Sequence, residues 1–245
     1  MASIAGHFLF WRKKYNRLAM NLSTSLLEIR LGQNQKLFEI DSLTAIDKQT
    51  VSQVEVHALG LVGDQQAESF HGGTERALLQ FDCDHYAILK QQFPESETYF
   101  KNGGFGENLV AQGFNEHNIC IGDQISIGSV ILEVSQPRQP CFKLNYRFKQ
   151  QSLSQFSQDN SITGWFYRVI KPGVISTDDS LELIARPLPQ WTIAQVQYYL
   201  YHDLKNQTAM QQLLELPQLA KETKSVFEKR MQRQQVENWQ ERLVG

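Results

Sequence analysis

The chain has 245 residues, of which 41% are hydrophobic and 20% charged, and its formal net charge is -2. This length fits one large domain, or one medium and one small domain. The near-neutral charge argues against a protein that holds nucleic acid through bulk positive charge. No segment approaches the roughly 20 apolar residues of a membrane span. We therefore expect a globular cytoplasmic protein without a membrane anchor.

The three cysteines are Cys83, Cys120 and Cys141, and no CxxC spacing occurs. So sparse and odd a set is typical neither of a disulfide framework nor of a structural zinc or iron–sulfur site. At the N-terminus, an apolar run over 8–11 is followed, rather than preceded, by cationic residues. A signal peptide has the opposite order. We therefore interpret 1–22 as an N-terminal extension and not as a signal peptide.

The patterning after the extension favours β-structure. Alternating or β-branched apolar runs bounded by turn residues predict strands, and an apolar pattern at helical spacing predicts a helix. Closely spaced strands are expected over 119–134, ending in the apolar run 130–134. The other predicted strands are 26–31, 50–59, 77–81, 164–170 and 180–184. Predicted helices run from Asp82 or Asp84 to Phe93 and over 153–158.

The composition changes at Arg186–Pro189, which we interpret as a linker between a domain over 23–187 and a second one over 190–245. Thr192 and Gln195 have the spacing of a capping box, which predicts the start of a helix. Two further helices are expected over 208–216 and from 220 to about Arg242. The second domain is therefore predicted to consist of three helices.

The stretch Ser135–Leu144 carries the strongest chemical signal. Pro137 and Pro140 interrupt a regular strand and predict an irregular, extended turn. Cys141 lies in this turn, between Arg138 and Lys143. Neighbouring cations favour the thiolate, which is the form that attacks electrophiles and binds metals. The alternative is that Cys141 is a small buried hydrophobic residue, as many free cysteines are.

Two glycine-containing stretches add candidate binding residues. In the first, Gly72 and Gly73 allow backbone N–H groups to approach an anion, with His71 and Arg76 on either side. A glycine pair also occurs in ordinary tight turns, so this signal is weak alone. The second stretch, 103–109, lacks the spacing and the preceding strand of a dinucleotide-binding motif.

Within that second stretch, Glu107 and Asn108 are candidate polar groups at a pocket. The two remaining cysteines are weaker candidates than Cys141. Cys120 lies between two isoleucines and is expected in the core, and Cys83 lies beside two aspartates that disfavour a thiolate.

Taken together, these motifs resemble the MOSC-domain family, named after the C-terminal domain of molybdenum cofactor sulfurase, and within it the YiiM-like proteins. The similarity runs from about residue 24 to the C-terminus, in matching order. The motifs that carry it are Leu61–Asp64, Phe70–Arg76, Phe105–Leu109, Ser135–Leu144 and Gly164–Trp165. The three helices after a proline-containing linker also fit the YiiM-like branch.

The resemblance implies a mainly β (α+β) fold, with a barrel-like MOSC domain followed by a small three-helix domain. It also implies a molybdenum–pterin cofactor (Mo-molybdopterin), with Cys141 as the protein ligand to molybdenum, a role that suits a soft thiolate. We expect cations and backbone amides to neutralise the phosphate and pterin oxygens of the cofactor. The expected cofactor-binding residues are Gly72, Gly73, Arg76, Glu107, Asn108, Arg138 and Lys143.

The activity implied by the resemblance is reduction of N-hydroxylated compounds, such as hydroxylaminopurine-type bases, to amines. His71 is the expected proton donor, because an ordinary imidazole titrates near neutral pH; a structural histidine is the alternative. Electrons are expected from a separate reductase, with the helical tail as a docking surface. The oligomeric state stays open, and a homodimer is possible.

Two other functions compete with this reading. The protein could carry the molybdenum cofactor or sulfur without reductase turnover. It could also bind nucleic acid through the lysines and arginines of the tail. Glutamates interleave with those cations, however, so a solvated helix face explains the pattern better.

Overall fold

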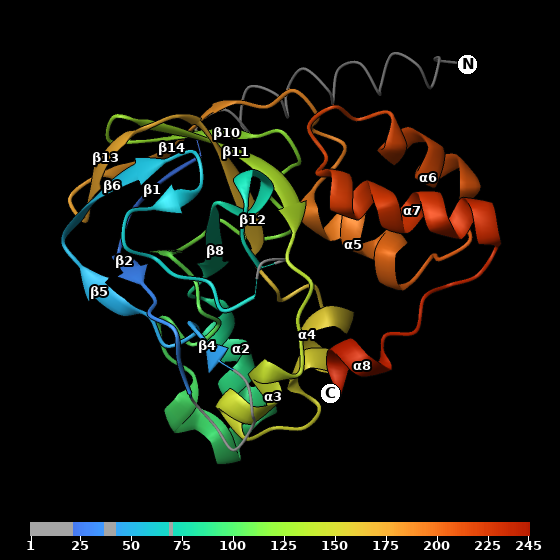
Figure 1. Ribbon diagram of the computed structural model, residues 1–245, viewed down its shortest axis with the longest axis horizontal. Helices are drawn as coiled ribbons and strands as arrows, with labels where there is room; N and C mark the ends of the chain where they lie inside the picture. The colour runs from blue at the N-terminus through green and yellow to red at the C-terminus, as the bar shows by residue number, and fades with distance from the viewer. Residues whose placement is uncertain (1–21, 37–42, 69–70) are drawn as a thin grey trace, which may run out of the picture.

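The structure is a computed structural model and describes residues 22–36, 43–68 and 71–245 (Figure 1). All of the predicted extension except Leu22 lies outside the described residues. So do Ser69 and Phe70, which precede the glycine pair.

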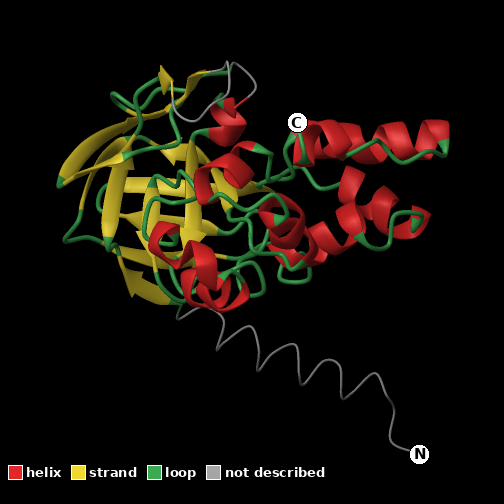
Figure 2. Cartoon of the chain, turned by 90° about the horizontal axis from the view of Figure 1, so that it is seen from below, coloured by secondary structure: helices red, strands yellow, loops and turns green. Residues whose placement is uncertain are grey.

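Nine strands form the main sheet, in the order β1-β14-β10-β11-β12-β8-β9-β2-β5. All neighbours pair antiparallel except β8 and β9, which are parallel. The sheet curls into a half-barrel, with the helices gathered to one side of it (Figure 2). The strands are β1 Ser23–Ser25, β2 Glu28–Leu31, β5 Gln49–Val51, β8 Leu78–Asp82, β9 Leu109–Ala111, β10 Gln124–Ile127, β11 Val130–Pro137, β12 Trp165–Lys171 and β14 Ser180–Ala185.

Two smaller sheets complete the β-structure. One has the order β13-β6-β7 and the other pairs β3 with β4. Their strands are β3 Gln35–Lys36, β4 Leu43–Thr44, β6 Gln53–His57, β7 Gly60–Leu61 and β13 Gly173–Ser176. The α+β class and the barrel-like architecture predicted from the sequence are confirmed.

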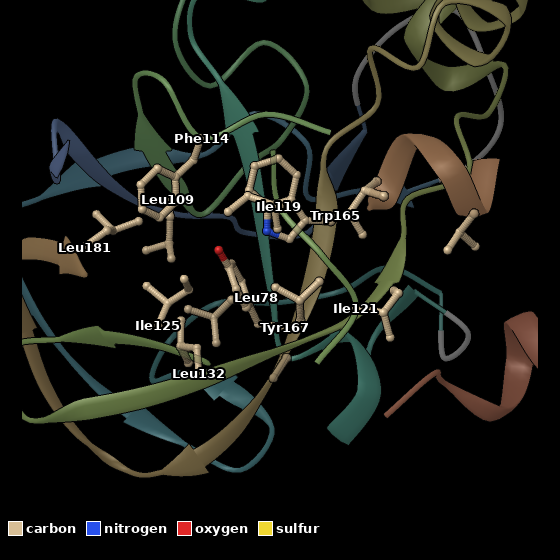
Figure 3. Packing of buried hydrophobic residues seen from close by; sticks show 14 of the residues in the cluster. Leu78, Leu109, Phe114, Ile119, Ile121, Ile125, Leu132, Trp165, Tyr167 and Leu181 are labelled. Atoms are coloured by element: carbon tan, nitrogen blue, oxygen red, sulfur yellow. The ribbon is translucent and has the colours of Figure 1, made fainter. Parts of the chain in front are cut away.

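The sequence pattern of each strand follows its place in the half-barrel. In β14, Leu181 and Leu183 are buried while Ser180, Glu182 and Ile184 are exposed, as expected for a strand with one buried face. All five residues of β8 are buried, since protein covers both of its faces. Figure 3 shows the large apolar side chains that fill the curl, among them Trp165 and Tyr167 of β12.

A second apolar cluster lies beside the sheet, among short helices. Phe105 stacks on Phe81 with ring centroids 4.1 Å apart, and Phe148 packs against Phe105 at 5.4 Å. The helices around this cluster are α2 His85–Gln92, η3 Pro94–Tyr99, α3 Lys143–Phe148 and α4 Leu153–Asp159. The sequence predicted α2 and α4 but not α3, which begins two residues after Cys141.

The C-terminal segment contains the expected helices with one correction. The capping prediction is confirmed, because Thr192 Oγ1 accepts a hydrogen bond from Gln195 N at 3.0 Å. The third helix was predicted to reach about Arg242 but ends at Arg233, where Gln234 adopts a left-handed conformation (φ 52°) that reverses the chain. The helices are α5 Ile193–Tyr201, α6 Gln207–Leu214, α7 Lys221–Arg233 and α8 Gln240–Leu243.

These helices share the core of the sheet. Trp191, Val196 and Phe227 belong to the same apolar cluster as the strand residues of the half-barrel. A backbone hydrogen bond also joins the tail to the sheet, since the N–H of Ala220, just before α7, donates to the carbonyl of Ser135 in β11 at 3.0 Å. The helical tail is therefore packed into the molecule, so a truncation at residue 190 would open the core.

In the part of the chain that the structure describes, no helix has both the length and the apolar character needed to cross a membrane.

Candidate functional site

A cavity of about 540 Å³ lies where the half-barrel, the α3–α4 region and the C-terminal helices meet. Its size is within the roughly 300–1,000 Å³ of small-molecule sites. Distant segments form its wall, including the loop before β5, the turn η2 (Thr74–Arg76), the Cys141 turn, α7 and α8. Its ionisable and thiol lining residues are Lys48, Asp64, Glu68, His71, Arg76, Arg138, Cys141, Lys143, Glu222, Glu241 and Arg242.

Cys141 lies in this wall, half-buried, between the end of β11 and the start of α3. The regular ladder ends later than predicted: it is irregular between Val134 and Gln136, and Pro137 still pairs with Trp165. The proline needs no ladder donor there, because it is the last residue of the strand. The turn that follows is fixed by Ser154, whose hydroxyl donates to Cys141 O at 2.6 Å.

The other two cysteines, Cys83 and Cys120, lie outside the described lining of the cavity. Burial raises the pKa of Cys83 to about 11 and that of Cys120 to about 12, with the neighbouring carboxylates of Asp82 and Asp123 acting in the same direction. Both are therefore thiols at neutral pH.

Arg138 is the most unusual cation of the site. Its guanidinium lies 5.5 Å from the centroid of the Phe105 ring, and burial lowers its pKa. Among the described residues it is one of the few whose buried side-chain nitrogen, here Nη1, has no hydrogen-bond partner. Such a group is costly to bury unless a ligand supplies the missing acceptor. Nη1 of Arg138 is therefore available to donate a hydrogen bond to a ligand in the cavity.

A buried network that the sequence did not reveal positions Arg138. The backbone N–H of Arg138 donates to Gly164 O at 3.0 Å. Gly164 N in turn donates to Glu116 at 2.7 Å, and the same carboxylate lies 2.6 Å from Nε2 of His85. Gly164 has a φ of 78°, and an added Cβ would lie 2.2 Å from the carbonyl oxygen of Gln80. Only glycine fits there.

Arg76 and Lys143 also line the cavity, but each is paired with a carboxylate at its rim. Arg76 Nη2 lies 2.5 Å from Glu222, whose side chain is 53% exposed. Lys143 Nζ lies 3.5 Å from Glu68 and donates to Leu43 O at 3.1 Å. Ion pairs with exposed partners contribute little stability, so these carboxylates can yield to an anionic ligand.

His71 lies beside these cations, and its protonation differs from the sequence-based expectation. Burial lowers its pKa to about 4, and the positive charges of Lys143, Arg138 and Arg76 act in the same direction. The imidazole is therefore neutral near pH 7 as long as no anion offsets those charges. It can accept a proton or a hydrogen bond, but it is not an acid that titrates near neutrality.

Asn108 lines the cavity, but its side-chain oxygen and nitrogen are hydrogen-bonded to other groups of the protein. Its Oδ1 accepts from Leu79 N at 3.1 Å, and its Nδ2 donates to Arg30 O at 3.1 Å and to Asp64 Oδ2 at 2.8 Å. Asp64 also lies 2.5 Å from Nζ of Lys48. Both amide hydrogens are used, so this side chain stabilises the wall.

Glu107 is fully buried and is not among the described residues of the cavity wall. Its Oε1 accepts from the Tyr86 hydroxyl at 2.8 Å and from Gly103 N at 2.7 Å, and burial raises its pKa. Gly72 and Gly73 are also absent from the described lining; they form the turn that leads to Arg76. The structure thus brings together six of the predicted residues: His71, Arg76, Asn108, Arg138, Cys141 and Lys143.

Sequence reasoning missed several residues of the wall. Asp64 is the last residue of Leu61–Asp64, one of the motifs that carry the family resemblance. That motif could have indicated that Asp64 lies at the site, where it pairs with Lys48. Glu222 and Arg242 lie far along the chain in the helical tail. No local pattern distinguishes them from other charged residues of solvated helices.

Comparisons with known proteins agree with this architecture. A family model described as the MOSC domain matches residues 67–182, and one described as the YiiM-like 3-alpha helix domain matches residues 191–234. The fold and these matches define a protein with a MOSC domain, of the molybdenum cofactor sulfurase type, followed by a YiiM-like 3-alpha helix domain and then by the short helix α8.

Among relatives, protein YiiM of Escherichia coli (strain K12) is 37% identical over 76% of this chain and 84% of that protein. A protein named reductase from Gibberella moniliformis is 41% identical over 70% of this chain, but the chain spans only 31% of that protein. The crystal structure of YiiM from Escherichia coli superposes with a TM-score of 0.78 and 30% identity, over 91% of this chain and 100% of that one. This chain belongs to the YiiM-like family of MOSC-domain proteins.

Proposed function

We propose that the protein binds a molybdenum cofactor in this cavity and uses it to reduce N-hydroxylated compounds to amines. The observation that carries the proposal is that two half-buried groups line the same cavity: the thiol of Cys141, and the guanidinium of Arg138, whose buried Nη1 has no hydrogen-bond partner in the described structure. Membership of the MOSC family supports a role related to the molybdenum cofactor. The relative named reductase supports redox chemistry.

The residues of the cavity fit the chemical groups of such a cofactor. A thiolate from Cys141 is a soft ligand that suits molybdenum in a sulfur-rich shell. Arg138 Nη1 requires an acceptor, and a phosphate or pterin oxygen is one that forms charge-assisted bonds with guanidinium. Arg76 and Lys143 line the same cavity. They can also bind the cofactor's oxygens once the carboxylates of Glu222 and Glu68 move away from them.

Removing oxygen from an N–OH group gives an amine and water, and it consumes two electrons and two protons. The bound cofactor would supply the two-electron redox change, which ordinary side chains cannot. The protein would orient the substrate and manage protons. A separate reductase would deliver the electrons.

We retain His71 as the candidate for proton transfer, with one condition set by its environment. Three cations help to hold its pKa at about 4. An anionic ligand among those cations would offset their charge, so it would raise the pKa of His71 and make protonation accessible. Its role as a donor therefore depends on ligand binding.

The test is elemental analysis of protein produced in a host that makes the cofactor, with Cys141→Ser in parallel. We expect near-stoichiometric molybdenum in the wild type and little in the variant. The loaded wild type should reduce an N-hydroxylated purine with a chemical electron donor. Metal without turnover, together with release of molybdopterin to an apo-enzyme, would instead identify a carrier. Metal in neither sample would overturn the proposal.

A further inference from the structure

The last helix of the chain, α8, lies beside α4 (Figure 1), and its residue Arg242 is hydrogen-bonded to the Cys141 turn. The side chain of Arg242 donates through Nη1 to the carbonyl of Pro140 at 2.5 Å. The backbone carbonyl of Arg242 accepts from Phe142 N at 2.8 Å. One residue of the tail therefore holds the peptide groups on both sides of Cys141.

We propose that Arg242 is a positioning residue that fixes the Cys141 turn, and that α8 is part of the site. The consequence for catalysis rests on the proposed function, because it assumes that Cys141 anchors the cofactor. The positioning itself is a property of the chain and can be tested without cofactor.

The turn needs such support because of its own sequence. Prolines have no backbone N–H and cannot complete a ladder. Pro137 ends β11, and Pro140 is the middle residue of the segment 138–142 that leads to α3. Buried backbone polar groups must still find partners. Arg242 supplies a donor for Pro140 O and an acceptor for Phe142 N, both of which would otherwise lack a regular partner in the turn.

Further contacts dock α8 on the two helices that follow the turn. Arg242 Nη2 donates to Gln158 of α4 at 2.5 Å, and Asn145 of α3 donates to Leu243 O at 2.7 Å. The guanidinium also lies 5.8 Å from the centroid of the Tyr201 ring of α5. Arg242 thus joins the Cys141 turn, α4 and α5.

The segment leading to α8 is anchored too. Arg230 of α7 forms two hydrogen bonds with Glu237, at 2.9 and 2.6 Å. The match to the three-helix family model ends at residue 234, so α8 lies beyond it. Glu241 and Arg242 nevertheless line the cavity. The tail contributes to the site itself and not only to a remote surface.

The test uses cofactor-free full-length protein and compares wild type with Arg242→Met. Two readouts are followed by mass spectrometry: amide exchange of the peptide that contains Phe142, and alkylation of Cys141 by iodoacetamide across pH. The limiting alkylation rate at high pH reports access rather than ionisation. We expect Arg242→Met to raise both rates about tenfold, as loss of a charged hydrogen bond implies.

Controls separate positioning from general loosening. Cys83 in the same digest is an internal reference and should not change. Arg233→Met removes an exposed cation at the end of α7 and should behave as wild type. Arg242→Lys keeps a donor for Pro140 O and should restore much of the protection. If Arg242→Met does not fold, Arg242→Gln replaces it, with acceleration expected on the same readouts.

Unchanged exchange and alkylation in a folded Arg242→Met or Arg242→Gln protein would overturn the inference, whatever its molybdenum content. Molybdenum content in the same variants tests the proposed function separately. If alkylation is faster in the variant but no sample contains molybdenum, Arg242 positions the turn and the proposal that the turn holds a molybdenum cofactor is wrong.

Discussion

The polar residues that line the cavity form two sets, here called its two walls, which differ in whether their polar atoms have hydrogen-bond partners in the protein. On one wall, Arg138 is half-buried and its buried Nη1 has no hydrogen-bond partner in the described structure, and Arg76 is paired with an exposed glutamate. On the other wall, Asn108 and Asp64 are saturated by hydrogen bonds to each other and to the backbone. Within the lining of the cavity, polar atoms without a protein partner, rather than polar residues as such, are the ones available to a ligand.

Replacing Arg138 gives the sharpest test of the first wall. Arg138→Met should reduce the molybdenum content of purified protein about tenfold or more, because a charge-assisted bond to the cofactor is lost. Its free energy of unfolding should stay the same or rise, since a partly buried charge with an unsatisfied buried N–H group is removed. Elemental analysis and urea unfolding measure the two quantities. Full metal content in the variant would contradict the distinction between the walls.

Replacing Asn108 should have the reverse outcome. Asn108→Leu would leave the N–H of Leu79, the carbonyl of Arg30 and one oxygen of Asp64 without this partner. The expected loss is about 3 kcal/mol in the free energy of unfolding. Asn160→Leu, at an exposed site, should change it by less than about 0.5 kcal/mol. Equal effects of the two substitutions in urea unfolding would show that the saturated wall is not structural.

The pH dependence of His71 tests the electrostatics between the walls. Because its pKa is about 4 in the folded protein and ordinarily 6.5, the unfolded chain binds more protons between these pH values. Stability relative to His71→Gln should therefore fall as the pH drops from 6.5 towards 4. NMR of the ring should show no titration above pH 5 in the cofactor-free protein. A midpoint near 6.5 would contradict the inferred field of the three cations.

The smallest effect is expected for the rim carboxylates. Glu222→Gln should strengthen binding of inorganic phosphate up to about fivefold, because an exposed ion pair that competes for Arg76 is worth at most about 1 kcal/mol. Glu228→Gln, on the exposed face of the same helix, should leave the affinity unchanged. Calorimetric titration compares them. Weaker binding in Glu222→Gln would mean that Glu222 orients Arg76 rather than competes with the anion.

The longer strands of the main sheet were predictable because the pattern of buried and exposed residues is visible in short stretches of sequence, whereas β1, β9 and β13 were not predicted. The alternation in β14 and the apolar run of β8 are local consequences of one or two buried faces. The end of α7 was missed because Gln234 gives little warning that it will adopt a left-handed turn. The strand predicted over 130–134 was too short, because β11 continues past an irregularity after Val134 to Pro137, where proline is tolerated as the last residue of a strand.

The candidate site was predictable only in part, for a similar reason. Cys141, Arg138 and Lys143 lie within one motif, so their proximity follows from chain connectivity. Whether a neighbouring polar residue faces the cavity or the interior does not follow, and Glu107 and Asn108, adjacent in sequence, differ in just this respect.

The sequence by itself determined the family, the α+β class and the residues of the Cys141 motif, because these depend on local order along the chain. Only the tertiary structure decided which cations have partners, that His71 is neutral near pH 7, and that Arg242 holds the turn containing Cys141. Pairing, burial and electric field depend on segments that lie a hundred residues apart in sequence and meet only when the chain folds.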